Sequence, residues 1–292
     1  MSSDNSVRRD IGQFLTTRRA RITPSEAGLP SFRGKRRVPG LRREEVALLA
    51  GISIEYYTRL ERGHARGVSD EVIENVAAAL QLNDIERAHF VELVRIANAV
   101  PGTRRATTPL RIRRTVRDLL EAMTGSAVFV RNARMDVLAT SRLGRALYYQ
   151  LYEEPANRGN LARFVFLDHR GREFYRNWNR IAQEAVGSLR IAAVHDPDDQ
   201  ELSDLIGELS VGSEQFRVRW AAHEVRYYRT GTNSFRHPAA GDFDLDYTAL
   251  ELAADPGLTM IAYTAGSRPK SKNALELLRK WGPGRDPSAA GV

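Results

Sequence analysis

The chain has 292 residues, of which 42% are hydrophobic and 27% charged, and its formal net charge is +8. The length suits two domains of ordinary size. The absence of cysteine excludes disulfides, cysteine-ligated zinc, iron–sulfur clusters and thiol chemistry. No stretch approaches the roughly 18 apolar residues of a membrane span, and the first residues lack the apolar run of a secretory signal. We therefore expect a cytoplasmic protein without a membrane segment.

The positive charge is concentrated in the first two-fifths of the chain. Residues 1–117 hold 22 lysines and arginines against 13 acidic residues, whereas the rest of the chain holds 22 against 23. A polyanion-binding module joined to a near-neutral domain has this distribution. The alternative is a general compositional bias toward arginine, which charge alone does not exclude.

An all-α domain of five helices is predicted for residues 1–97. Apolar residues recur at helical spacing, and a Pro- and Gly-rich basic segment over 23–41 interrupts the pattern. Ser69 is a suitable N-cap for the fourth helix. The helices are expected over 7–22, as two short helices between Arg42 and Leu60, over 69–82, and from Asn83 or Asp84 onward.

The segment Arg42–Gly63, RREEVALLAGISIEYYTRLERG, has the pattern of a helix-turn-helix. Two short helices that cross steeply need a small residue where they touch, which Ala47 provides. The turn between them needs a positive φ, which Gly51 adopts without strain. Ser53 is placed to cap the second helix and Gly63 to end it. The residues predicted to face the core are Val46, Ala50, Ile52, Tyr57 and Leu60. A plain helical bundle with a chance glycine turn is the alternative, but the flanking helices and the local positive charge favour DNA binding.

The second helix of this motif is the predicted recognition helix, because its first turns enter the major groove in such domains. Loop arginines are expected to contact phosphates, which carry no base identity. The residues expected to set sequence preference are Arg43, Glu55, Tyr56 and Arg59, with Ser53 and Ile54 at the same helix end. Those expected to set affinity are Arg36, Arg37 and Arg62. One such domain covers few base pairs, so we expect a homodimer on double-stranded DNA.

A second domain of α+β type, with a small antiparallel sheet, is predicted over residues 110–282. A linker over 98–109 precedes it, and a Gly-, Pro-, Ser- and Ala-rich tail over 283–292, expected to be disordered, follows it. Strands are expected over 127–131, 135–140, 226–237, 243–252 and 258–265. Helices are expected over 110–123, 142–152, 172–194, 200–210 and 213–222.

Residues 8–97 resemble the Cro/C1-type (XRE-family) helix-turn-helix domain. The run VPGLRREEVALLAGISIEYYTRLERG, followed by NDIERAHFVELV, resembles the regulators that carry an MmyB-like C-terminal ligand-binding domain. The stretches RVRWAAHEVRYYRTGTNSFRHPAAGDFDLDY and LTMIAYTA resemble that second domain. The resemblance covers nearly all of residues 8–266. It departs from the simpler phage-repressor pattern in the long basic loop 23–41 and at Tyr57, where a branched aliphatic residue is commoner.

This resemblance implies a PAS-like second domain, a sheet wrapped by helices around an apolar cavity, and a fatty-acid-like ligand. Large aromatic residues of this chain are expected to line the cavity, although the same residues could simply fill a core. The expected lining residues are Phe164, Phe166, Phe174, Trp178, Leu189, Trp220 and Phe235, with Asn132, Arg163 or His223 at a polar end.

Two other classes of function were weighed against this one. An enzyme is disfavoured because the six histidines form no HExxH or His-x-His motif, and no Gly-rich phosphate loop or GxSxG motif occurs. The Asp-Pro-Asp-Asp run over 196–199 is typical of a turn rather than a metal site. We therefore expect no catalytic residue, no cofactor and no metal. The remaining alternative is a second domain that serves dimerisation or a protein partner and binds no small molecule.

Overall fold

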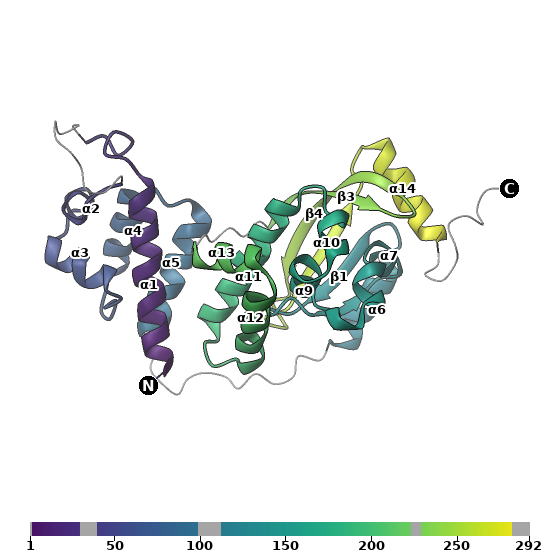
Figure 1. Ribbon diagram of the computed structural model, residues 1–292, viewed down its shortest axis with the longest axis horizontal. Coiled ribbons are helices and arrows are strands. Elements are labelled where there is room, and N and C mark those ends of the chain that lie inside the picture. Colours follow the sequence, from purple (N-terminus) through teal and green to yellow (C-terminus); the bar gives the residue numbers. More distant parts are fainter. Residues whose placement is uncertain (1, 30–39, 99–111, 223–228, 282–292) are drawn as a thin grey trace. The chain divides into compact units, whose positions relative to one another are not determined.

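The computed structural model describes residues 2–29, 40–98, 112–222 and 229–281. The chain divides into two compact units (Figure 1). The first unit holds residues 1–105 with the segments 190–200 and 219–226, and the second holds the remaining residues. The predicted linker, apart from Asn98, and the predicted disordered tail lie outside the described residues. Among the described helices, none is long and apolar enough to cross a membrane.

The N-terminal part of the first unit is helical, as predicted. Its helices are α1 (Ser2–Arg21), α2 (Arg43–Ala50), α3 (Ile54–Glu61), α4 (Asp70–Ala79) and α5 (Asp84–Asn98). The first helix extends beyond its predicted start toward the N-terminus. The Ser69 side chain accepts a hydrogen bond from the Val72 backbone N–H, which confirms it as the N-cap of α4.

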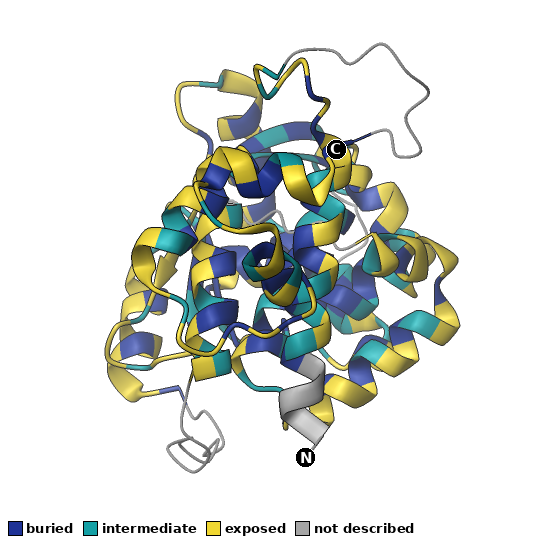
Figure 2. Ribbon diagram, turned by 90° about the vertical axis from the view of Figure 1, so that its left-hand side faces the viewer, coloured by how far each residue is buried: buried dark blue, intermediate teal, exposed yellow. Residues whose placement is uncertain are grey.

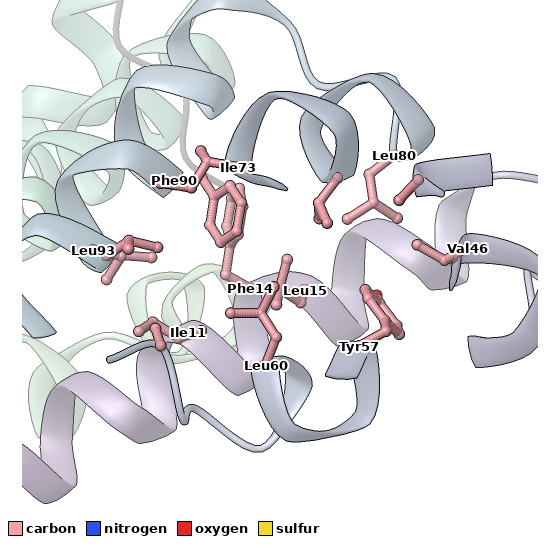
Figure 3. Packing of buried hydrophobic residues seen from close by; sticks show 14 of the residues in the cluster. Ile11, Phe14, Leu15, Val46, Tyr57, Leu60, Ile73, Leu80, Phe90 and Leu93 are labelled. Carbon is pink, nitrogen blue, oxygen red and sulfur yellow. The ribbon is translucent and has the colours of Figure 1, made fainter. Parts of the chain in front are cut away.

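The core of this helical domain is a single cluster of apolar side chains (Figure 3). Helix α1 contributes Ile11, Phe14 and Leu15, which helical spacing places on one face. The ring of Phe14 stacks on Phe90 of α5, with 6.0 Å between centroids. Each such buried side chain contributes about 1.5–3 kcal/mol relative to exposure. The helices accordingly alternate between buried and exposed residues around their circumference (Figure 2). Ala47, Val46, Ala50, Tyr57 and Leu60 are all buried, as predicted.

The close approach of α1 to the end of α3 explains Gly63. This residue has φ +82°, and a Cβ there would lie 2.1 Å from the backbone oxygen of Arg8. At the next contact, a Cβ on Gly12 would lie 2.7 Å from the backbone oxygen of Glu61. Both distances are shorter than any Cβ tolerates, so the two helices can approach this closely only where a side chain is absent. The predicted role of Gly63 as the residue that ends α3 is confirmed.

The second part of the chain is of α+β type, with a five-stranded antiparallel sheet in the order β2-β1-β5-β4-β3. The strands are β1 (Ala127–Arg131), β2 (Val137–Thr140), β3 (Thr230–His237), β4 (Gly241–Glu251) and β5 (Thr259–Thr264). The helices are α6 (Arg114–Ala122), α7 (Arg142–Leu147), α8 (Tyr149–Glu153), α9 (Leu161–Phe166), α10 (His169–Phe174), α11 (Trp178–His195), α12 (Gln200–Gly212), α13 (Glu214–Ala221) and α14 (Pro269–Lys280), with a 3-10 turn at Pro155–Asn157. The predicted α+β class with an antiparallel sheet is confirmed for this domain.

The predicted continuous helix over 172–194 is wrong, because the chain leaves the helix between α10 and α11. Tyr175 forms a β-bridge with Phe235 of β3, and the Arg176 N–H donates to the Ser234 carbonyl over 2.9 Å. Pairing with the edge of the sheet therefore outcompetes the helical pattern. Two helices, α9 and α14, were not predicted, although Pro269 in the first turn of α14 is a helix-start signal.

A buried histidine at the end of β3 is expected to make the second unit sensitive to acid. The Nδ1 atom of His237 accepts from the Ala239 N–H over 3.1 Å, and Nε2 lies 3.2 Å from the Ala146 carbonyl, so the neutral ring satisfies both contacts. Burial lowers the pKa of His237 to about 4, from its ordinary 6.5.

The sign of the effect follows from the two protonation states. The unfolded chain takes up a proton near pH 6.5, whereas the folded unit does so only near pH 4. The stability that the neutral ring contributes is therefore present above about pH 6.5 and is lost as the pH falls toward 4. We expect His237→Gln to flatten the fall in the free energy of unfolding over this range, measured by urea titrations at several pH values. A variant with an unchanged pH dependence would contradict this role of the ring.

Candidate DNA-binding surface and ligand cavity

The turn of the helix-turn-helix has the predicted geometry. Gly51 follows α2 with φ +66°, and its N–H donates back to the end of α2. The hydroxyl of Ser53 accepts from the Tyr56 N–H over 3.0 Å, which caps the start of α3. These two residues fix the direction in which α3 leaves the turn.

The outer side of α3 presents polar and apolar side chains to solvent. Ile54 is 47% exposed, and Glu55 and Arg59 are exposed, whereas Tyr56 is half-buried. Arg62, directly after the helix, is exposed. The structure thus brings six of the nine predicted DNA-binding residues together along α3 and its two ends. Arg36 and Arg37 lie outside the described residues.

The remaining predicted residue, Arg43, makes a contact that the sequence did not indicate. Its Nε donates to a carboxylate oxygen of Glu61, at the end of α3. The other oxygen of Glu61 accepts from Arg19 Nε over 2.8 Å and from the Thr16 hydroxyl over 3.2 Å. The Glu61 side chain is only 1% exposed, whereas that of Arg43 is 50% exposed. Glu61 therefore joins α1, α2 and α3, and Arg43 is partly a structural residue.

A cavity of about 80 Å³ lies in the second unit. One wall is a face of the sheet, because alternate residues of a strand share a face. The strands contribute Phe129, Arg131, Asn233, Tyr247, Ile261 and Tyr263. Helix α11 forms the opposite wall, and its lining residues, at helical spacing, are Ile181, Glu184, Ala185 and Ser188. The cavity is therefore lined by residues of one unit.

Buried tyrosine hydroxyls form a hydrogen-bonded chain at this cavity. Tyr175 Oη donates to Tyr148 Oη over 3.2 Å, and Tyr148 Oη lies 2.9 Å from Tyr263 Oη. The amide Nδ2 of Asn233 donates to Tyr263 Oη over 2.9 Å. Burial is the main cause that raises the pKa of Tyr263 to about 12, and it raises the pKa values of Tyr148 and Tyr175 as well. All three hydroxyls thus remain protonated donors at neutral pH.

An acidic side chain, Glu184, shares this end of the cavity. It pairs with Arg180 over 2.6 Å and accepts from the Tyr247 hydroxyl over 3.5 Å. Burial raises the pKa of the Glu184 carboxyl, while the charge of Arg180 opposes that shift.

The structure describes nine of the ten predicted ligand-binding residues, and none of these nine lines the cavity. Three of the aromatic residues, Phe164, Phe174 and Phe235, are buried directly behind the tyrosines. Ring centroids of Phe174 and Tyr148 are 5.4 Å apart, and those of Phe235 and Tyr263 are 5.5 Å apart. These residues support the cavity wall from behind.

The other predicted residues lie in several places. Asn132 bonds to Asp136 across the turn after β1, and Arg163 bonds to Glu208 over 2.7 Å. Phe166 packs edge-on against Trp178, and Leu189 is fully buried. The ring of Trp220 faces the guanidinium of Arg190 at 4.4 Å, and His223 is outside the described residues. A direct ligand contact for any of these ten residues stays a prediction.

A sequence signal for the observed cavity did exist. In α11, Glu184 and Ser188 interrupt an otherwise apolar stripe, four residues apart. Polar side chains inside an apolar stripe indicate a buried polar site. Tyrosines at buried positions give a second signal, because a buried hydroxyl needs a partner.

Comparison with known families agrees with this arrangement. A family model described as a helix-turn-helix domain matches residues 10–90. A second, described as the MmyB-like transcription regulator ligand binding domain, matches residues 112–278, more than half of the chain. The chain belongs to the MmyB-like transcription regulators. The α2–Gly51–α3 segment lies within the first match of this MmyB-like regulator, and every residue that lines its cavity lies within the second. A search of curated proteins found no match.

Proposed function

We propose that this transcription regulator is a cytoplasmic homodimer of the XRE (Cro/C1-type) class that binds specific DNA sites and senses a small, largely apolar molecule. The DNA-binding part rests on the capped turn at Gly51 and Ser53, after which α3 exposes Ile54 and Arg59. The sensing part rests on the cavity between the sheet and α11.

In this proposal α3 lies in the major groove and its first turns contact base edges. Arg59 is long enough and exposed enough to pair with a guanine, and Arg62 follows where the chain passes the phosphates. Arg43 has a half-exposed side chain that is oriented by Glu61, which suits a residue that reaches a base from a fixed position. Residues proposed to face bases are Arg43, Ser53, Ile54, Glu55, Tyr56 and Arg59, and those proposed to face phosphates are Arg36, Arg37 and Arg62.

For the second domain we propose a PAS-like fold that holds the ligand against the sheet. Support comes from the five-stranded antiparallel sheet, one face of which carries the cavity. Leu161, Val165 and Ile261 give the cavity apolar walls, which suit a fatty-acid-like ligand, although the volume favours a short one. The ligand alters DNA binding only if it binds one state of the regulator better than the other.

A homodimer is proposed because one helix-turn-helix domain contacts too few base pairs for genomic specificity. Two copies on a two-fold or direct-repeat site double the number of base pairs that are read. Titration of the full chain onto its site should then give two chains for each site.

The proposed function is tested by DNA binding of the full chain at several salt concentrations. Because residues 1–117 carry 22 basic against 13 acidic side chains, we expect a steep fall of affinity with salt, with a log–log slope of about −0.9 for each phosphate contacted. Arg59→Ala is expected to reduce discrimination at one base pair by about 1–3 kcal/mol. A slope near zero would reject DNA binding through this surface.

Arg62→Ala is the matched control, since it removes an exposed arginine three residues further along the chain. It is expected to weaken binding to specific and non-specific DNA alike and to reduce the slope by about one. If Arg62→Ala changed the preferred sequence while Arg59→Ala did not, the proposed division of roles would be reversed.

A further inference from the structure

The chain of three tyrosine hydroxyls at the cavity has one proton more than the bonds between these hydroxyls use. Asn233 Oδ1 accepts from Arg180 over 2.5 Å, and because an arginine only donates, the amide orientation is fixed. Asn233 Nδ2 therefore donates to Tyr263, and Tyr263 cannot return a hydrogen bond to it. Tyr175 donates its hydroxyl proton to Tyr148. The bond between Tyr148 and Tyr263 uses the hydroxyl proton of one of these two residues.

Three hydroxyl protons thus serve two bonds between hydroxyls. If Tyr148 donates to Tyr263, the proton of Tyr263 is left over, and if Tyr263 donates, that of Tyr148 is left over. Within the described part of the chain neither hydroxyl has another acceptor in reach. Both side chains are almost fully buried and line the cavity. A buried donor without an acceptor is unfavourable, so an acceptor atom on a bound molecule is favoured at this point.

The charges around this point favour a neutral acceptor over an anionic one. Glu184 lies on the same part of the wall, where Tyr247 donates to it, and its charge is already balanced by Arg180. A ligand carboxylate at the Tyr148–Tyr263 pair would add a negative charge close to that of Glu184, and among the described lining residues the one cation is Arg131. In a cavity of low dielectric such a charge is strongly disfavoured, whereas a neutral carbonyl oxygen is not.

The cationic residue of the cavity lining, Arg131, donates from its guanidinium to the Asn132 carbonyl over 3.3 Å, at the turn after β1. Arg131 lies opposite Thr259 of β5, whereas Tyr263 lies opposite Ala127. Four residues of strand β1 therefore separate the two positions, about 13 Å at 3.3 Å per residue. The guanidinium of Arg131 is therefore directed away from the end of β1 that lies beside Tyr263.

The size of the ligand is limited by the cavity. Its volume of about 80 Å³ has room for roughly five to eight waters. In terms of liquid volume this corresponds to a molecule of roughly ten non-hydrogen atoms. Phe129, Ile261 and Ala249 provide the apolar surface against which the body of such a molecule packs.

We propose that the cavity selects a small, neutral carbonyl compound, such as a ketone or an ester, whose oxygen accepts the hydrogen bond from the Tyr148–Tyr263 pair. This inference rests on the proposed sensing function, but it replaces the acid group of a fatty-acid-like ligand with a neutral carbonyl group. A short-chain acid held at Arg131 is the rival ligand. It predicts that an acid binds more tightly than a neutral carbonyl compound, whereas our proposal predicts the reverse.

The test uses the full chain and probes of equal size: acetophenone as the carbonyl compound, benzoate as the acid and isopropylbenzene as the hydrocarbon. Calorimetric titration is expected to show acetophenone binding about tenfold more tightly than either of the others, the difference of one hydrogen bond. At least one of Tyr148→Phe and Tyr263→Phe is expected to reduce the affinity ratio of acetophenone to isopropylbenzene to about one. The ratio is insensitive to a general loss of folded protein.

Tyr152→Phe is the matched control, because it removes the hydroxyl of a half-buried tyrosine in the same unit that packs under Arg145 and does not line the cavity. It should leave the affinity ratio unchanged. Tighter binding of benzoate, an equal affinity for all three probes, or no binding would overturn the proposal. If benzoate were bound and altered DNA binding, the sensing function would stand while the ligand class proposed here would fail.

Discussion

Replacing Glu61 with alanine is expected to lower the free energy of unfolding of the helix-turn-helix domain by about 3 kcal/mol, the lower end of the cost of breaking a buried ion pair. The side chain of Glu61 is 1% exposed and that of Arg19 12% exposed. Without the carboxylate, Arg19 keeps its bond to the Leu41 carbonyl but loses its counter-charge. The guanidinium then remains in a poorly solvated position without compensation.

The same substitution should reduce specific DNA affinity at least tenfold, although Glu61 faces away from solvent. Its carboxylate joins the start of α2, through Arg43, to the end of α3. Recognition needs these two helices in a fixed relation, because α3 and Arg43 are proposed to reach bases from different helices. Hydrogen exchange of α1 and α3 amides measures the stability, and a binding isotherm measures the affinity.

Two variants separate this role from a general effect of removing charge. Glu55→Ala removes an exposed carboxylate from the same helix and is expected to change stability by no more than about 0.5 kcal/mol. Arg43→Ala should destabilise less than Glu61→Ala, because Glu61 then keeps Arg19 and Thr16. If Glu61→Ala left exchange in α1 unchanged, Glu61 would not be the residue that joins these helices.

The helix-turn-helix could be predicted well because its determinants are local. Gly51 and Ser53 act on their immediate neighbours, and the core positions of α2 and α3 follow from helical spacing. The prediction for Arg43 was incomplete for a physical reason. Its partner, Glu61, lies 18 residues further along the chain, and only the packing of α2 on α3 brings the two together.

The polar positions of α11 mark one wall of the cavity in the sequence, but the rest of its lining could not be predicted, because it combines strands and helices that are distant along the chain. Tyr247 and Tyr263 lie opposite each other because of the register between β4 and β5. The hydrophobic periodicity of a single strand does not predict which residues of another strand it pairs with. The large aromatic residues were the natural candidates for a lining. Phe164, Phe174 and Phe235 instead fill the layer behind the wall, whereas the tyrosines, whose hydroxyls need partners, lie at the cavity.

A second large effect is expected where α9 and α10 meet. A Cβ on Gly171 would lie 1.9 Å from the backbone oxygen and 2.8 Å from the carbonyl carbon of Phe164. Because the obstructing atoms belong to the backbone, no side-chain rotation relieves the clash. We expect Gly171→Ala to destabilise the second unit by about 3 kcal/mol, the upper part of the range for overpacking. Probe binding should weaken as well, since Leu161 and Val165 of the displaced helix line the cavity.

Gly207→Ala makes the same chemical change, but we expect it to raise the free energy of unfolding rather than lower it. Gly207 is an exposed residue of α12, and a Cβ there would meet no atom within 4 Å. Because alanine has the higher helix propensity, this variant should gain about 0.5–1 kcal/mol. Urea titrations of the two variants, followed by circular dichroism, should therefore give midpoints on opposite sides of the unsubstituted protein. A midpoint for Gly171→Ala at or above that of the unsubstituted protein would mean that α9 and α10 do not pack this closely, and that the cavity wall formed by α9 lies elsewhere.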